Sequence, residues 1–76
     1  MIVRFEGHYD KDADIAWVRF EHYDASRAVA EETSSGLREV DPTTGEVVAL
    51  EFWQASKRLP EALLQMLPPP EVGIAA

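Results

Sequence analysis

Four acidic residues follow the spacing of a calcium-binding loop. Asp10, Asp12, Asp14 and Glu21 occupy the first, third, fifth and twelfth positions of such a loop. The sixth position needs glycine for a sharp turn, but Ile15 stands there. The residues that follow have the two-residue period of a strand, which cannot wrap around an ion. We therefore predict a solvated aspartate-rich turn, without a metal-ligating residue, at this position.

The other candidates for chemistry are isolated from one another in the sequence. His8 and His22 each lack a neighbouring second ligand, so we predict structural roles for both. No serine stands in a nucleophile-elbow context, and the four glycines are too far apart for a nucleotide-binding loop. Arg19 and Glu51 could act as a catalytic pair, but a cross-strand ion pair or ordinary surface charges explain them better. We predict no catalytic and no cofactor-binding residues.

The composition limits the class of protein. The chain has 76 residues, enough for one small domain, and no cysteine, which excludes disulfides and thiolate metal sites. With 14 acidic and 7 basic residues its net charge is -7, and the basic residues are scattered. We therefore expect no nucleic-acid binding and no membrane attachment, whereas a basic protein partner is compatible with this charge. We see no signal peptide and no run that could span a bilayer, and we expect a cytoplasmic location.

The strongest strand signal lies at residues 45–53, where β-branched and aromatic residues follow a turn at 41–45. We expect positive φ at Gly45 in this turn, and a bulge there would shift the register of the strand. Residues 37–40 predict a short strand. The signal at 28–33 fits either a short strand or half a helical turn.

A hairpin is predicted near the start of the chain. Residues 2–9 and 14–21 both alternate with period two, and turn-forming residues separate them. We expect Tyr9 to pair with Asp14, which gives the hairpin one consistent apolar face. Residues 22–27 are polar and predict a loop.

After residue 53 the period of the apolar residues becomes helical. Leu59, Leu63 and either Met66 or Leu67 recur at this spacing, and Pro60 suits the first helical position. The sequence thus predicts an α+β domain over residues 1–67, with an antiparallel sheet of four to five strands built from hairpins and one C-terminal helix. Residues 68–76 form a proline-rich tail.

The two faces of the predicted sheet differ in character. The face that the helix covers holds Val3, Phe5, Val18, Phe20, Val48, Leu50 and Phe52. The opposite face holds Ile2, Ile15, Trp17, Val47 and Trp53, with Arg4, Glu6, Arg19 and Glu51 among them. A monomer seldom exposes two tryptophans and several aliphatic residues on one face. We predict a self-complementary interface formed by Ile15, Trp17, Arg19, Val47, Glu51 and Trp53. The alternative is that the tail and residues 22–35 fold over this face within one chain.

An ordered set of strand and turn motifs extends over about residues 5–59, namely residues 9–20, Thr33, residues 45–52 and Ala55-Ser56. The order and spacing of these motifs resemble a bacterial family, domain of unknown function 2283. Ala49 stands where the family usually has glycine, and the proline-rich tail is a second departure. The resemblance implies a compact β-rich domain with a small helix and no established activity. Some members of this family are similar to the products of small genes that lie beside toxin-like genes. The resemblance therefore implies an antitoxin role as one candidate.

Together these features predict a self-associating protein-interaction module. We expect a homodimer and, as a further partner, a basic toxin-like protein. The alternative is a small ligand-binding protein or enzyme with a site at the dimer seam around Arg19, Glu51 and the two tryptophans. A structural homodimer without a ligand is the third possibility.

Overall fold

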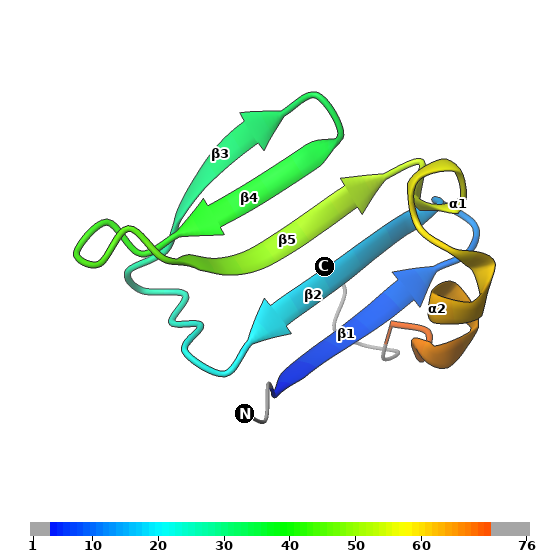
Figure 1. Cartoon of the computed structure of the whole chain (residues 1–76), viewed down its shortest axis with the longest axis horizontal. Helices are drawn as coiled ribbons and strands as arrows, with labels where there is room; N and C mark the ends of the chain where they lie inside the picture. Colours follow the sequence, from blue (N-terminus) through cyan, green and yellow to red (C-terminus); the bar gives the residue numbers. More distant parts are fainter. Residues whose placement is uncertain (1–3, 71–76) are drawn as a thin grey trace.

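Five antiparallel strands form one sheet, and two short helices follow it in the chain (Figure 1). The computed structural model describes residues 4–70. The elements are β1 (Phe5–Asp10), β2 (Ile15–Phe20), β3 (Val29–Thr33), β4 (Gly36–Val40), β5 (Val47–Trp53), α1 (Ala55–Arg58) and α2 (Glu61–Met66). The strand order is β1-β2-β5-β4-β3. The predicted antiparallel α+β architecture is confirmed, with five strands and with residues 29–33 as a strand.

The strand with the strongest sequence signal, β5, lies at the centre of the sheet. It pairs with β2 on one side and with β4 on the other. The segment between β2 and β3 runs past the ends of β5 and β4, so β3 can form the far edge (Figure 1). Gly45 has φ 78 in the turn before β5, as predicted.

The register of the first hairpin differs from the prediction by two residues. Tyr9 pairs with Ala16 and Phe5 with Phe20, instead of Tyr9 with Asp14. The reason is that Asp14 belongs to the turn: its backbone is left-handed, with φ 57, and its side chain bonds groups outside the sheet. Because side chains alternate with period two, an error of two residues leaves every side chain on its predicted face.

A bulge in β5 changes the face of one predicted interface residue. Glu39 pairs with Ala49 but Val40 pairs with Val47, so Val48 is the extra residue. Paired residues share a face, and Val47 therefore lies with Val40 on the side away from the tryptophans. The bulge lies at Val48, whereas the sequence indicated Gly45 as the position for a bulge.

The two helices pack at one end of the sheet. Their core consists of the buried residues Ala16, Ala55 and Leu64, with Tyr9, Phe52, Leu59 and Leu67 packed around it. This is the predicted face of the sheet, because Phe52 lies on it. Phe5 was predicted to be part of the same core, but it is 52% exposed. It lies at the end of β1 far from Tyr9, where the helices do not reach.

The predicted C-terminal helix corresponds to α2, and a further short helix, α1, precedes it. Leu59 has an extended backbone, φ -119 and ψ 149, because the residue before a proline disfavours the helical conformation. Pro60 then caps α2 instead of being its first residue. No helix among residues 4–70 is long and apolar enough to cross a bilayer.

Candidate functional site

Both helices cover one side of the sheet, and the other side forms the candidate site. We call it the tryptophan face. The register places Glu6, His8, Asp10, Ile15, Trp17, Arg19, Ala30, Glu32, Leu37, Glu39, Ala49, Glu51 and Trp53 on it. Four of its members are glutamates. The tryptophan face is therefore both aromatic and acidic.

Glu51 joins the two tryptophans. Its carboxylate accepts a hydrogen bond from Trp17 Nε1 on one oxygen and from Trp53 Nε1, at 2.6 Å, on the other. Trp17 lies directly opposite Glu51 on the neighbouring strand, and Trp53 lies two residues further along β5. All three side chains are half-buried. The result is a pair of indole rings whose orientation is set by one carboxylate.

The other predicted interface residues have different surroundings. Ile15 is half-buried and pairs with Trp53, so it belongs to the same group. The guanidinium of Arg19 lies 5.1 Å from the centre of the Tyr23 ring instead of binding Glu51. Val47 lies on the opposite face. The structure thus brings four of the six predicted residues together and separates Arg19 and Val47 from them.

Tyr23 extends from the loop after β2 onto the tryptophan face. Its hydroxyl donates to Glu39 at 3.4 Å, and its ring lies next to Arg19. Burial, and then the negative charge of Glu39, raise the pKa of the Tyr23 hydroxyl above its usual value. The sequence suggested that residues 22–35 could fold over this face, and Tyr23 does so at one end. Tyr23 makes no such contact at the other end of the face, where Trp17 and Trp53 lie.

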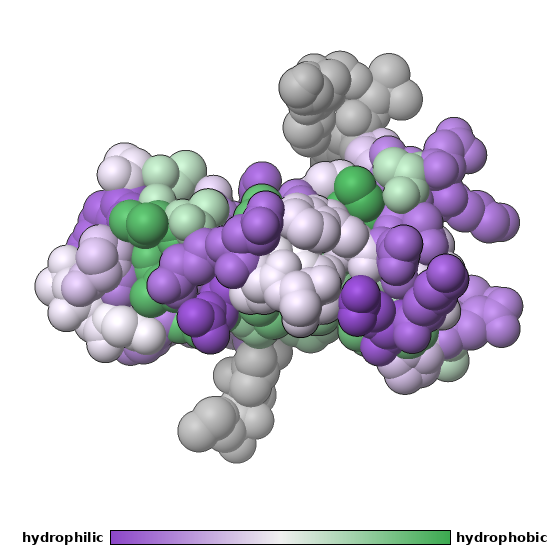
Figure 2. All heavy atoms as spheres, turned by 90° about the horizontal axis from the view of Figure 1, so that it is seen from above, coloured by the Kyte–Doolittle hydropathy of each residue, from purple (hydrophilic) through white to green (hydrophobic). Residues whose placement is uncertain are grey.

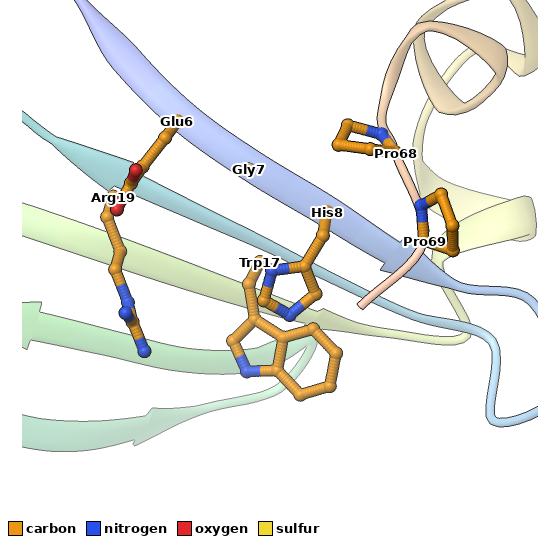
Figure 3. Close-up of a pocket in the computed structure, with 7 residues that line it drawn as sticks. All are labelled: Glu6, Gly7, His8, Trp17, Arg19, Pro68 and Pro69. Carbon is orange, nitrogen blue, oxygen red and sulfur yellow. The ribbon is translucent and has the colours of Figure 1, made fainter. Parts of the chain in front are cut away.

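A hollow of about 310 Å³ lies where the tryptophan face meets the outer edge of β1 (Figure 3). Its walls are Glu6, Gly7, His8, Trp17, Arg19, Pro68 and Pro69. The ring centres of His8 and Trp17 are 4.6 Å apart, with the rings tilted by 37°. The carbonyl oxygen of Pro68 accepts a hydrogen bond from the Tyr9 N–H at 2.9 Å, so the start of the predicted tail is held against β1. Residues 71–76 of that tail lie outside the described residues.

The aspartates that suggested a calcium loop bind protein groups instead. Asp10 Oδ1 accepts the backbone N–H groups of Asp12 and Ala13, which forms the hairpin turn. Asp14 accepts hydrogen bonds from the Tyr9 hydroxyl at 2.6 Å, the Ser56 N–H at 2.9 Å and the Ser56 hydroxyl at 2.7 Å. Among residues 4–70, no three histidine, aspartate or glutamate side chains converge on a common metal position.

The bonds to Asp14 were not visible in the sequence. Ser56 is 42 positions away along the chain, and a turn aspartate indicates only local bonding. The Tyr9 hydroxyl, followed by Ser56, lowers the pKa of the Asp14 carboxyl below its usual value. The same hydrogen bond is the main reason that the pKa of Tyr9 is raised. Asp14 thus fixes α1 to the hairpin turn and takes no part in the tryptophan face.

Comparison with family models, with curated proteins and with solved structures finds no match to this chain. The resemblance to domain of unknown function 2283 therefore stays an expectation from the sequence. What the tryptophan face does is argued from its own geometry and charge.

Proposed function

We propose that this protein is a protein-interaction module whose tryptophan face binds a basic segment of a partner protein. One observation supports the proposal above all. Of the five glutamates in the strands, four lie on the tryptophan face, namely Glu6, Glu32, Glu39 and Glu51. The fifth, Glu31, lies on the helix face and binds Arg38 at 3.1 Å. The negative charge of the sheet is thus gathered on the face that the helices leave uncovered.

The aromatic residues on this face suit a cationic partner. A lysine or arginine side chain is attracted to the face of an indole ring, and tryptophan is the most effective aromatic residue for this contact. Because Glu51 holds both indoles in place, little side-chain entropy would be lost on binding. Figure 2, which views the molecule from above, shows hydrophilic residues over much of the described surface, with apolar residues in separate patches.

Self-association through the same face is the competing arrangement. A second copy would bring the four glutamates of one tryptophan face against the four of the other. Among the described strands, Arg19 is the one arginine on each of these faces. Like charges at a contact surface are repulsive, which favours a basic partner over a second copy. A catalytic role is also less well supported, because both Glu51 oxygens accept hydrogen bonds from the indoles.

The proposal is tested with two double variants that change the net charge equally. Glu6→Gln with Glu39→Gln removes two charges from the tryptophan face, and Glu31→Gln with Glu46→Gln removes two from elsewhere. The probes are short synthetic peptides of lysine and valine, titrated by calorimetry. We expect the first variant to weaken binding by about threefold to tenfold, and the second to leave it nearly unchanged.

Two results would contradict the proposal. Equal weakening by both double variants would mean that binding follows net charge and not this face. A dimer in light scattering that Trp53→Glu converts to a folded monomer would mean that the face binds a second copy. We expect the wild-type protein to be monomeric in this measurement.

A further inference from the structure

The outer edge of β1 has backbone groups that point away from the sheet. Among residues 4–70, β1 is an edge strand that pairs with β2 alone. The Tyr9 N–H points outward, since it donates to Pro68 at 2.9 Å. In an antiparallel strand the N–H and C=O groups of every second residue point to the same side. The N–H and C=O groups of Gly7 and Phe5 therefore point outward as well.

The chain's own prolines use this edge only in part. Pro68 accepts one hydrogen bond from β1, but proline has no N–H, so Pro68 and Pro69 cannot donate to the outward carbonyls of the strand. Among the described residues, Gly7 has no backbone partner on its outer side. Gly7 also lines the hollow between its neighbours Glu6 and His8 (Figure 3). The hollow and the unused backbone groups of Gly7 thus lie at the same place on the edge of β1.

The side chains beside this edge differ between the two faces of the sheet. On the helix face, Phe5 is 52% exposed and Leu67 lies close over Gly7. On the tryptophan face, Glu6 is exposed and the His8 ring packs against Trp17. A strand added beside β1 continues both faces, because its side chains alternate between them. Its residues on the helix face would meet an apolar surface, and those on the other face would meet a carboxylate and aromatic rings.

We infer that the partner binds as an extended segment in which apolar and basic residues alternate, and that this segment pairs with the outer edge of β1 as a sixth strand. The inference rests on the proposed function and specifies how the partner segment binds. Hydrogen bonds to Gly7 and Phe5 hold the backbone of the segment. Apolar side chains cover Phe5, and basic side chains lie beside Glu6 on the tryptophan face.

Amide hydrogen exchange, measured by NMR on the full chain, tests this arrangement. The probe is a short capped peptide that alternates lysine and valine. We expect exchange at the Gly7 amide to slow about tenfold when the peptide is present at about ten times its Kd. Exchange at the outward amides of the other edge strand, Ala30 and Glu32 in β3, should not change.

Matched peptides and variants sharpen the test. The same peptide with N-methyl groups on alternate residues keeps its charge but loses its backbone donors, and we expect its affinity to fall at least about tenfold. Phe5→Ser should weaken binding of the alternating peptide by about threefold or more. Val29→Ser is the control, because Val29 is also 52% exposed and lies on the β3 edge.

The outcomes separate this inference from the proposed function. Slower exchange in β3 instead of at Gly7 would overturn the assignment to β1. If the alternating peptide and its N-methylated form bind equally, and binding still depends on Glu6 and Glu39, the tryptophan face binds basic segments without strand addition. That result would overturn the inference and leave the proposed function standing.

Discussion

At the scale of single residues, Glu51 is the key side chain of the tryptophan face. A carboxylate can accept hydrogen bonds on both oxygens, and here each oxygen receives one indole N–H. Hydrogen bonds to a charged group contribute more to stability than those between neutral groups. Glu51 therefore stabilises the fold and also orients the two rings that we propose to contact the partner.

Replacement of Glu51 by glutamine should test this dual role. The amide has one acceptor oxygen, and its NH₂ group would face an indole N–H, so one of the two hydrogen bonds is lost. We expect Glu51→Gln to lower the free energy of unfolding by about 1–3 kcal/mol in urea titrations. Glu46→Gln, at an exposed position in the turn before β5, is the control and should have little effect. Equal stability of the two variants would show that the indole contacts do not stabilise the fold.

At the scale of elements, close contacts between segments set the positions of the strands and helices. A Cβ atom at Gly36, the first residue of β4, would lie 1.8 Å from the carbonyl oxygen of Glu51, so only glycine allows β4 to approach β5 here. Asp14 sets the position of α1 in a similar way. It accepts the N–H of Ser56 through its side chain and the N–H of Ala55 through its carbonyl oxygen, which satisfies the first amides of α1.

The junction between Asp14 and α1 should make stability depend on pH. The pKa of Asp14 is lower in the folded protein than its ordinary value of 3.8, first because of Tyr9 and then because of Ser56. The stabilisation is therefore complete above that ordinary value and is lost as the pH falls through the folded pKa. We expect the Tm of the wild type to fall more steeply from about pH 5 to about pH 3 than that of Asp14→Asn.

Part of the acid sensitivity should remain in this variant. The pKa of Asp24 is also lowered, mainly by its hydrogen bonds with Ser26, and Asp24 is unchanged in Asp14→Asn. A wild-type Tm that falls no faster than that of Asp14→Asn over this pH range would contradict the assigned role of Asp14.

At the scale of the whole molecule, the separation of apolar and acidic surface is the main feature. The helices cover one end of one face, and four of the five strand glutamates lie on the other. The net charge is -7, so the folded chain repels itself, and the side-chain ion pairs among the described residues are exposed or partly exposed. Such pairs contribute little to stability.

Salt should therefore stabilise this protein. Added NaCl screens the repulsion between the glutamates, and we expect the Tm to rise between about 10 mM and about 150 mM NaCl. The double variant with Glu6→Gln and Glu39→Gln should show a smaller rise, because part of the repulsion has already been removed. A Tm that falls with salt would mean that ion pairs outweigh the repulsion.

The local features of this protein follow from short stretches of its sequence. The two-residue period of β1, β2 and β5 assigned most side chains to the correct face, even though the predicted hairpin register was wrong by two residues. The composition of residues 41–45 indicated a turn with positive φ at Gly45. The proline at position 60 indicated that a helix begins near it, but Pro60 precedes α2 instead of being its first residue, and its effect on Leu59, which follows the last residue of α1, was missed. These properties depend on neighbours within a few residues, and such neighbours are visible in the sequence.

Contacts between groups far apart in the chain depend on the tertiary structure. The bond between Trp17 and Glu51 joins residues 34 positions apart, and it depends on the pairing of β2 with β5. The bulge at Val48 moved Val47 off the tryptophan face, and Tyr23 reached Glu39 from a loop with no strand or helix signal. Whether the edge of β1 is free depends in turn on where the chain places Pro68. Contacts of this kind depend on packing among segments far apart in the chain, and the spacing of residue types along the sequence does not encode which pairing is the more stable.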